Sequence, residues 1–360
     1  MTTRRDFLKG AAAGIVFCGC GMVHGANAQA PRQKLPVSVN GKRIKTIDVH
    51  AHCHFREAGA VLGDAAASVQ LPPVNNAAAA FIEVEKRLAA MDEQAIDMEV
   101  LSINPFWYGK DREIAGTIVK IQNEKLAELC ASKPDRFAAF ASLTLQAPDL
   151  AVQELETAVK KQGLKGAAIG DVVNGVEFSD AKFNPVWAKA EELGVPLFIH
   201  PQGTPELAKR LSGNGWLANT IGNPLDTTIA LSHLIFEGTL DRFPGLKICS
   251  AHGGGYLPSY APRSDQSLRV APDMDTGVQL RKKPTEYLRT LYYDTLVFTA
   301  EALRHLAAEV GVSQLVLGTD HPIPWQDKAV DHILNAPGFT DEERRAMLGE
   351  TAATLLGIAP

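Results

Sequence analysis

The chain has 360 residues, of which 46% are hydrophobic and 21% are charged, and its formal net charge is −5. This composition is typical of a globular protein with enough chain for a large core. The negative charge excludes the basic footprint of a nucleic-acid-binding protein. Three cysteines, Cys53, Cys130 and Cys249, follow the N-terminal region at wide spacings, so no disulfide framework is expected.

The first 30 residues have the features of an export signal. Arg4-Arg5 forms a twin-arginine pair, residues 11–23 are apolar, and the small residues at 26–28 offer a cleavage site. The apolar stretch is short for a membrane span, so a stable membrane anchor is not expected. We therefore expect a periplasmic protein exported by the twin-arginine route, in which residues 31–44 lead into the fold.

From residue 45 onward, the sequence predicts alternating strands and helices. Short apolar runs predict strands at 45–51, 98–103, 137–143, 166–169, 196–199, 247–251, 291–294 and 314–317. Longer amphipathic stretches predict helices at about 78–94, 113–131, 183–193, 225–237, 300–310 and 341–356, and one that follows Ala147-Pro148-Asp149 and runs to about 161. We expect long loops at 55–77 and after His200, and irregular structure at 255–290 with a helix near its end.

Eight strands that alternate with helices favour parallel pairing, because each helix returns the chain to the same end of the sheet. Eight such units close naturally into a (β/α)8 barrel. The sequence thus predicts an α/β protein with one catalytic barrel domain over residues 45–360. A doubly wound open sheet is the alternative, but no G-x-G-x-x-G turn follows a predicted strand.

Polar residues stand at the carboxyl ends of several predicted strands, which meet at one mouth of a barrel. His50 and His52 alternate along the first strand and so share a face. His200 and His252 end the fifth and sixth strands, and Asp320 follows the eighth. Taken singly, each histidine could be structural. Together, three imidazoles and a carboxylate suit a divalent metal ion.

The fourth predicted strand bears on the number of metal ions. Its centre, residues 167–169, is Ala-Ala-Ile, and a two-metal site in this architecture commonly needs a carbamylated lysine there. Lys165 precedes the strand. The sequence therefore favours a single ion, with Zn²⁺ expected and Mn²⁺ as the alternative.

Four motifs carry a resemblance to a known family. They are Asp48-Val49-His50-Ala51-His52, Phe198-Ile199-His200-Pro201, Ala251-His252-Gly253-Gly254-Gly255 and Leu317-Gly318-Thr319-Asp320-His321-Pro322. Over residues 45–357 the chain resembles the amidohydrolase superfamily, and within it the branch of aminocarboxymuconate-semialdehyde decarboxylase and the aromatic-acid decarboxylases.

The resemblance implies roles for individual residues. The metal ligands would be His50, His52, His200 and Asp320. His252 would be the catalytic acid or base, with Asp320 as the next candidate, and the glycines after His252 are expected to leave room for substrate. The substrate-binding candidates are Arg87, Trp216, Arg263 from a neighbouring subunit, and His321, which stands where the decarboxylase often has an aromatic residue such as tyrosine.

The resemblance favours a metal-dependent decarboxylase, a carbon–carbon lyase, of a small aromatic or unsaturated carboxylic acid. A metal-dependent hydrolase of a lactone, ester or amide is the alternative, because it needs the same residues with water as the nucleophile. A ligand-binding protein without catalysis is a third hypothesis, but it would need no base beside the ligands. The expected partners are a small carboxylate substrate and further copies of the chain, in a homodimer or larger homo-oligomer.

Overall fold

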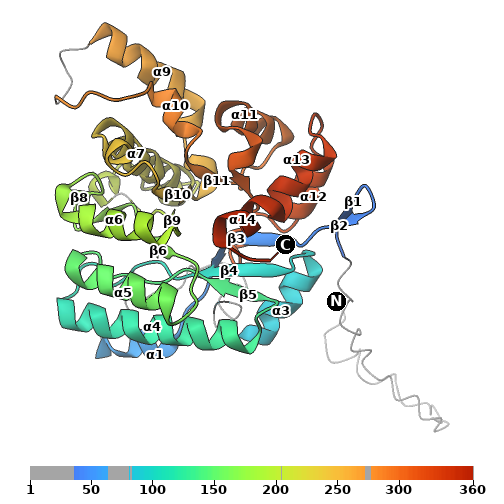
Figure 1. Ribbon diagram of the computed structural model, residues 1–360, viewed down its shortest axis with the longest axis horizontal. Helices are drawn as coiled ribbons and strands as arrows, with labels where there is room; N and C mark the ends of the chain where they lie inside the picture. Colours follow the sequence, from blue (N-terminus) through green and yellow to red (C-terminus); the bar gives the residue numbers. More distant parts are fainter. Residues whose placement is uncertain (1–35, 64–80, 82, 204, 272–276, 360) are drawn as a thin grey trace, which may run out of the picture. The chain divides into compact units, whose positions relative to one another are not determined.

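Parallel strands form a closed barrel in the computed structural model, which describes residues 36–63, 81, 83–203, 205–271 and 277–359 (Figure 1). In that part of the chain, the eight barrel strands are β3 (Ile47–His52), β4 (Met98–Ser102), β5 (Phe137–Ala139), β6 (Ala167–Ile169), β9 (Pro196–Ile199), β10 (Lys247–Ser250), β11 (Tyr292–Asp294) and β12 (Leu315–Val316). Two short antiparallel hairpins accompany them: β1 (Ser38–Val39) with β2 (Lys42–Arg43), and β7 (Val172–Val173) with β8 (Val176–Glu177).

The barrel closes through two seams. Strands β3, β4 and β5 pair in sequence order, and so do β6, β9, β10, β11 and β12. A parallel bridge between Ala141 and Ala167 joins β5 to β6, and another between Ala51 and His321 joins β3 to the segment after β12. Among the described residues, closure gives each barrel strand a neighbouring strand or segment on both sides. The predicted (β/α)8 barrel is confirmed, although several strands are shorter than the apolar runs suggested.

Helices connect and surround the strands (Figure 1). They are α1 (Arg56–Ala60), α3 (Val84–Glu93), α4 (Arg112–Ser132), α5 (Pro148–Lys160), α6 (Asn184–Leu193), α7 (Asn223–Phe236), α8 (Thr239–Arg242), α9 (Leu257–Val270), α10 (Pro284–Leu288), α11 (Ala300–Val310), α12 (Ala329–Asn335), α13 (Asp341–Arg345) and α14 (Thr351–Leu356). The local sequence determines where several of these helices begin or end. Pro148 starts α5, where the missing N–H costs nothing. Gly194 ends α6 at φ +67°, a conformation that suits glycine.

Two clusters of buried apolar side chains stabilise this arrangement, the larger of which spans the strands and the helices packed on them. The smaller cluster includes Phe140 and Phe198, whose rings stack 5.6 Å apart at an interplanar angle of 11°. The Phe198 ring also meets the His50 ring at 5.1 Å. The aromatic packing of the core thus reaches the strand ends that carry the motif histidines.

Two predictions for the loops need correction. The first half of residues 255–290 is not irregular, because α9 lies there, whereas the helix expected near the end of this stretch is confirmed by α10. The prolines in this stretch concealed α9: Pro258 occupies its first turn, which tolerates proline, and Pro262 lies inside it. The predicted loop at 55–77 begins with α1, and its residues 64–77 lie outside the described ranges.

The predicted export signal, residues 1–30, also lies outside the described ranges. Within the described ranges, no helix combines the length and the apolar character needed to cross a membrane. All described residues belong to one compact unit, Gln33–Pro360.

Candidate metal centre

Five predicted side chains meet at the carboxyl ends of the barrel strands. His50 and His52 lie at the end of β3. His200 follows β9, His252 follows β10, and Asp320 follows β12. All are buried except His252, whose side chain is 16% exposed. Their positions follow from parallel strands that end at the same rim. We call these five residues the ligand cluster.

Short distances join β3 to β12 within the ligand cluster. The Nε2 atoms of His50 and His52 lie 3.2 Å apart. Asp320 Oδ1 lies 3.2 Å from His50 Nε2 and 2.9 Å from His52 Nε2. The His200 ring centre lies 4.5 Å from that of His52 and 5.1 Å from that of His50. The coordinating atoms therefore face a common point.

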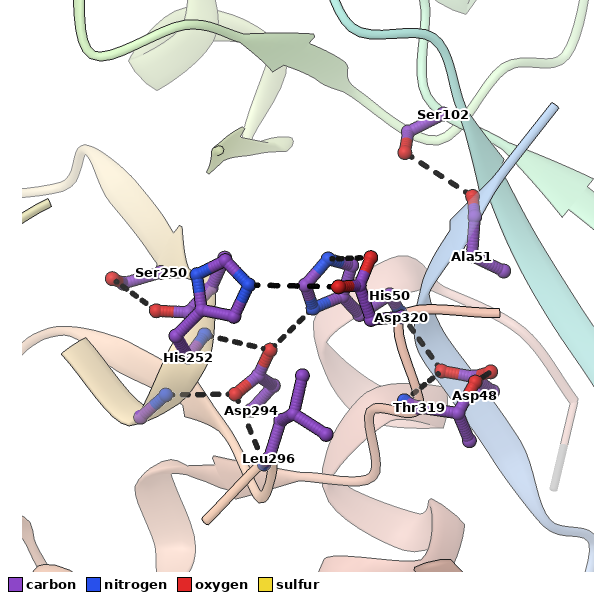
Figure 2. A network of polar contacts seen from close by, with 12 residues as sticks. Asp48, His50, Ala51, Ser102, Ser250, His252, Asp294, Leu296, Thr319 and Asp320 are labelled. Carbon is purple, nitrogen blue, oxygen red and sulfur yellow. Dashed lines mark hydrogen bonds and ion pairs between the residues drawn. The ribbon is translucent and has the colours of Figure 1, made fainter. Parts of the chain in front are cut away.

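His252 borders the same point. Its Nε2 lies 3.7 Å from Asp320 Oδ2 (Figure 2). One atom each from His50, His200, His252 and Asp320 lies within 4.8 Å of the others. The distances bring His252 together with the predicted ligands and do not by themselves separate an acid or base from a ligand.

The protonation of the ligand cluster suits a cation. Burial lowers the pKa of His200 well below its ordinary value, so its imidazole is neutral and able to coordinate. Neither ring nitrogen of His200 has a hydrogen-bond partner among the described residues. Burial alone would raise the pKa of Asp320, but His50, His252 and His52 hold it well below its ordinary value. A buried carboxylate beside partnerless imidazole nitrogens fits a divalent metal ion.

Asp294, at the end of β11, is a site residue that the sequence did not single out. Its Oδ2 lies 2.6 Å from His50 Nδ1 and accepts from the backbone N of His252 at 3.0 Å. Its Oδ1 accepts from the backbone N of Gly253 at 2.8 Å (Figure 2). The carboxylate thus orients one imidazole and holds the turn that carries another. Its position at a strand end was the available signal.

Hydrogen bonds of the Asp48 side chain and of the Asp320 backbone join β3 to the segment that follows β12. Asp48 Oδ1 accepts from the backbone N of His50 at 2.9 Å and of Thr319 at 3.1 Å. Burial raises the pKa of Asp48 to about 8. Asp320 and His252 have φ of +63° and +55°, which residues other than glycine rarely adopt. Asp320 N donates to His50 O at 2.8 Å. Such strain is commonly held in place at functional sites.

Arg87, on α3, lies in a buried network behind the ligand cluster. Its Nη1 donates to Glu99 Oε2 at 2.6 Å, and its Nη2 donates to the carbonyl of His52. His321 Nδ1 lies 2.6 Å from Glu99 Oε1. Burial would raise the pKa of Glu99, but the charges of Arg87 and His321 lower it below its ordinary value. Arg87 and His321 therefore brace the end of β3, and their contact with substrate stays a prediction.

A cavity of about 300 Å³ opens over the ligand cluster, and we call it the first cavity. His52, His200 and Asp320 line its base. Its walls carry four aromatic side chains and four amide side chains: Phe81, Phe106, Trp216, Trp325, Asn104, Gln202, Asn219 and Asn223. Trp216 lies where the sequence predicted a pocket residue, with its ring stacked on Trp325 at 5.5 Å. Arg263 is exposed on α9 and does not line this cavity.

The glycines after His252 serve close packing. A Cβ on Gly254 would lie 2.7 Å from the Tyr293 ring, and one on Gly255 would lie 2.1 Å from the carbonyl oxygen of Pro224. Both have positive φ. The expectation that these glycines leave open space for substrate is therefore wrong at Gly254, whereas Gly255 lines a cavity together with His252.

Fold and site together define a metal-dependent barrel enzyme of the kind that binds its ion at the carboxyl ends of the strands. Residues 47–358 match the amidohydrolase family model, and the chain belongs to this family. The chain is 31% identical to 2-amino-3-carboxymuconate-6-semialdehyde decarboxylase of Dictyostelium discoideum, over 76% of each protein. It is 30% identical to gamma-resorcylate decarboxylase of Rhodococcus jostii, over 75% of this chain and 86% of that one.

Solved structures of decarboxylases are also similar to this chain. A Polaromonas dihydroxybenzoic acid decarboxylase with bound manganese and the inhibitor 2-nitroresorcinol matches with a TM-score of 0.75 at 25% identity, over 87% of this chain and 97% of that one. The 5-carboxyvanillate decarboxylase of Sphingomonas paucimobilis matches with a TM-score of 0.78 at 24% identity, over 88% and 100% respectively, which concerns the fold. The resemblance seen in the motifs is confirmed.

Proposed function

We propose that this chain is a metal-dependent decarboxylase of an aromatic carboxylic acid. The ligand cluster would serve a hydrolase equally well, so the observation that carries the choice is that the curated relatives at 30–31% identity are decarboxylases. The aromatic walls of the first cavity suit a planar ring. The hydrolase reading is left without support beyond the shared metal-ligand residues.

A divalent ion would be held by His50, His52, His200 and Asp320. When bound, it supplies Lewis-acid polarisation of a substrate oxygen. We expect Zn²⁺, because imidazole and carboxylate ligands suit it. Mn²⁺ is the alternative, because the Polaromonas relative binds manganese.

One proton transfer would be carried out by a residue of the chain itself. His252, at the edge of the ligand cluster, delivers a proton to the ring carbon that bears the carboxylate. The bond from that carbon to the carboxyl group then breaks, its electron pair restores the ring, and CO₂ leaves. One proton is consumed in each turnover, and His252 regains it from solvent through its exposed edge. Asp294 holds the turn of His252 in place.

The charge of the first cavity bears on the substrate. Among the described residues that line it, none is Lys or Arg, and the undescribed internal residues, 64–80, 82, 204 and 272–276, include neither type. A single carboxylate can lie near the metal ion. A second carboxylate would need a cation from another copy of the chain, for which exposed Arg263 is the candidate. We therefore retain a homo-oligomer as part of the proposal.

The test is product analysis with 2-hydroxybenzoate. Metal-loaded protein should release CO₂ and phenol in equal amounts. Protein stripped of metal by a chelator should release neither, and added Zn²⁺ or Mn²⁺ should restore the reaction. Hydrolysis of a lactone or ester panel without CO₂ from any aromatic acid would overturn the proposal in favour of the hydrolase.

Export to the periplasm is also proposed, on the basis of Arg4-Arg5 and the small residues at 26–28. Replacing both arginines by lysine should leave the precursor in the cytoplasm, because the twin-arginine pair is the recognised feature. Exported protein should start after residue 28 by N-terminal sequencing, and a product that still begins at Met1 would contradict cleavage.

A further inference from the structure

A second cavity of about 320 Å³ adjoins the first, and we call it the second cavity. Asn219, Asn223 and Trp325 line both cavities. His252 lines the second cavity and does not line the first, whereas His52, His200 and Asp320 line only the first. A molecule that reaches both the metal ligands and His252 must therefore lie across the boundary between the two cavities.

The walls of the second cavity differ from those of the first. They include apolar groups from α7, from the segment between β11 and α11, and from α11 itself: Pro224, Leu296, Val297, Phe298 and Ala302. Apart from His252, no titratable side chain other than Tyr256 lines it among the described residues.

Two polar groups at its rim already have partners, and the amide side chains of Asn219 and Asn223, which it shares with the first cavity, are the other uncharged polar groups there. Tyr256 Oη lies 3.5 Å from the carbonyl oxygen of Thr220, a long contact. Thr220 Oγ1 donates to the carbonyl oxygens of Gly215 and Trp216, at 3.1 and 3.3 Å. A polar substituent that lies beyond the Asn219 and Asn223 amides, against the apolar walls, would lose water without gaining a partner, which is unfavourable. An apolar substituent would replace water against apolar walls, which is favourable.

We infer that the second cavity is a subsite for an apolar substituent of the substrate ring, such as an alkyl chain. The inference rests on the proposed function, because it takes His252 as the proton donor to the carboxylate-bearing carbon. With the carboxylate near the metal ligands and that carbon near His252, the ring position next to it points to the second cavity. The substrate class is then an aromatic monocarboxylic acid with an apolar group ortho to the carboxylate.

The first experiment measures kcat/KM for CO₂ release from 2-hydroxybenzoates that carry hydrogen, methyl, ethyl or propyl at position 6. Each added carbon that becomes buried should raise kcat/KM about fourfold, from the transfer free energy of one methylene. A flat or falling series in the wild-type protein would overturn the inference, and this outcome depends on no variant.

A variant pair locates the effect. Ala302→Phe adds a ring to the wall of the second cavity, and Ala308→Phe adds the same ring to an exposed position of the same helix. The ratio of kcat/KM for the propyl acid to that for the unsubstituted acid should fall to about one or below in Ala302→Phe. Ala308→Phe should keep the wild-type ratio. If Ala302→Phe keeps the wild-type ratio, the alkyl group binds outside the second cavity and the inference is overturned.

Binding separates this inference from the proposed function. If no acid in the series releases CO₂, the decarboxylase proposal fails on its own. Quenching of tryptophan fluorescence by 3-alkylphenols, which correspond to the decarboxylated products, then reports on the second cavity, since Trp325 lines it. Affinity that rises with chain length in the wild type and in Ala308→Phe, but not in Ala302→Phe, supports the subsite. Affinity independent of chain length overturns it.

Discussion

At the floor of the site, His50, His200 and Asp320 stand at strand ends and are buried, whereas at its mouth Trp216 and Phe298 come from connecting segments and are 43% and 59% exposed. The floor is held by hydrogen bonds to side chains and backbone of the barrel. At the mouth, the rings of Trp216 and Phe298 both contact the ring of Trp325. The difference suggests that the floor fixes the chemistry of the reaction and the mouth selects the substrate, as in other barrel enzymes.

The largest effect is expected from a substitution at the floor of the site, at His50. His50→Ala should remove both the metal ion and the activity, because this imidazole contacts His52 and Asp320 and is the partner of Asp294. Wild-type protein should hold about one divalent ion per chain, and the variant close to none by elemental analysis. His305→Ala, at an exposed position of α11, is the matched control and should keep both. Two ions at full occupancy in the wild type would contradict the single-metal prediction.

His252 sharpens the comparison because it lies where floor and mouth meet. As the acid, it should be dispensable for metal binding, so His252→Ala should keep the ion and lose turnover by a factor on the order of 10² to 10⁴. Metal content and rate are measured on the same preparation.

Two outcomes at His252 would change the mechanism. Loss of the ion together with the activity would make His252 a ligand, which its place within 4.8 Å of His50, His200 and Asp320 allows. Retention of both would leave Asp320 as the next candidate for the proton transfer.

Asp294 tests whether the floor depends on groups behind the ligands. Asp294→Asn keeps the shape but removes the charge beside His50 Nδ1, and a change of this kind typically costs 10- to 100-fold in metal affinity. Competition with a chromogenic chelator measures the affinity. Asp331→Asn, at an exposed position of α12, should leave it unchanged. An Asp294→Asn protein with wild-type affinity would show that the carboxylate holds only the turn at His252.

The sequence predicted the floor much better than the mouth, for a physical reason. A strand places alternate residues on one face, so His50-x-His52 and the residues after β9, β10 and β12 could be assigned to one rim before the structure was known. Asp294 obeys the same rule, but an aspartate after a strand is also common in turns, and nothing in the sequence reports its bond to His50. The second cavity depends on how α7, α11 and the loop before α12 pack, and no local pattern encodes that.

Arg87 illustrates the other limit of sequence reasoning. Its place on a predicted helix and its resemblance to a substrate-binding arginine were visible, but its buried pairing with Glu99 joins residues on separate elements. Long-range ion pairs of this kind follow from the tertiary fold. The same holds for α9, whose helical state overrides the prolines within its sequence.

The smallest effect is expected at the mouth, where Trp216 stacks on Trp325 at 5.5 Å with an interplanar angle of 18°. Trp216 has φ of +49°, an uncommon backbone conformation, and its side chain lines the first cavity. Stacking of an aromatic side chain on the substrate ring would be worth about 0.5 to 1.5 kcal/mol, and Trp216→Ala should therefore raise KM roughly two- to tenfold, with kcat and metal content nearly unchanged. Trp216→Phe should recover most of the loss. Steady-state kinetics with one acid on all three proteins gives the answer: a kcat that falls more than KM rises would mean that the mouth takes part in the chemical step, and the division between floor and mouth would not hold.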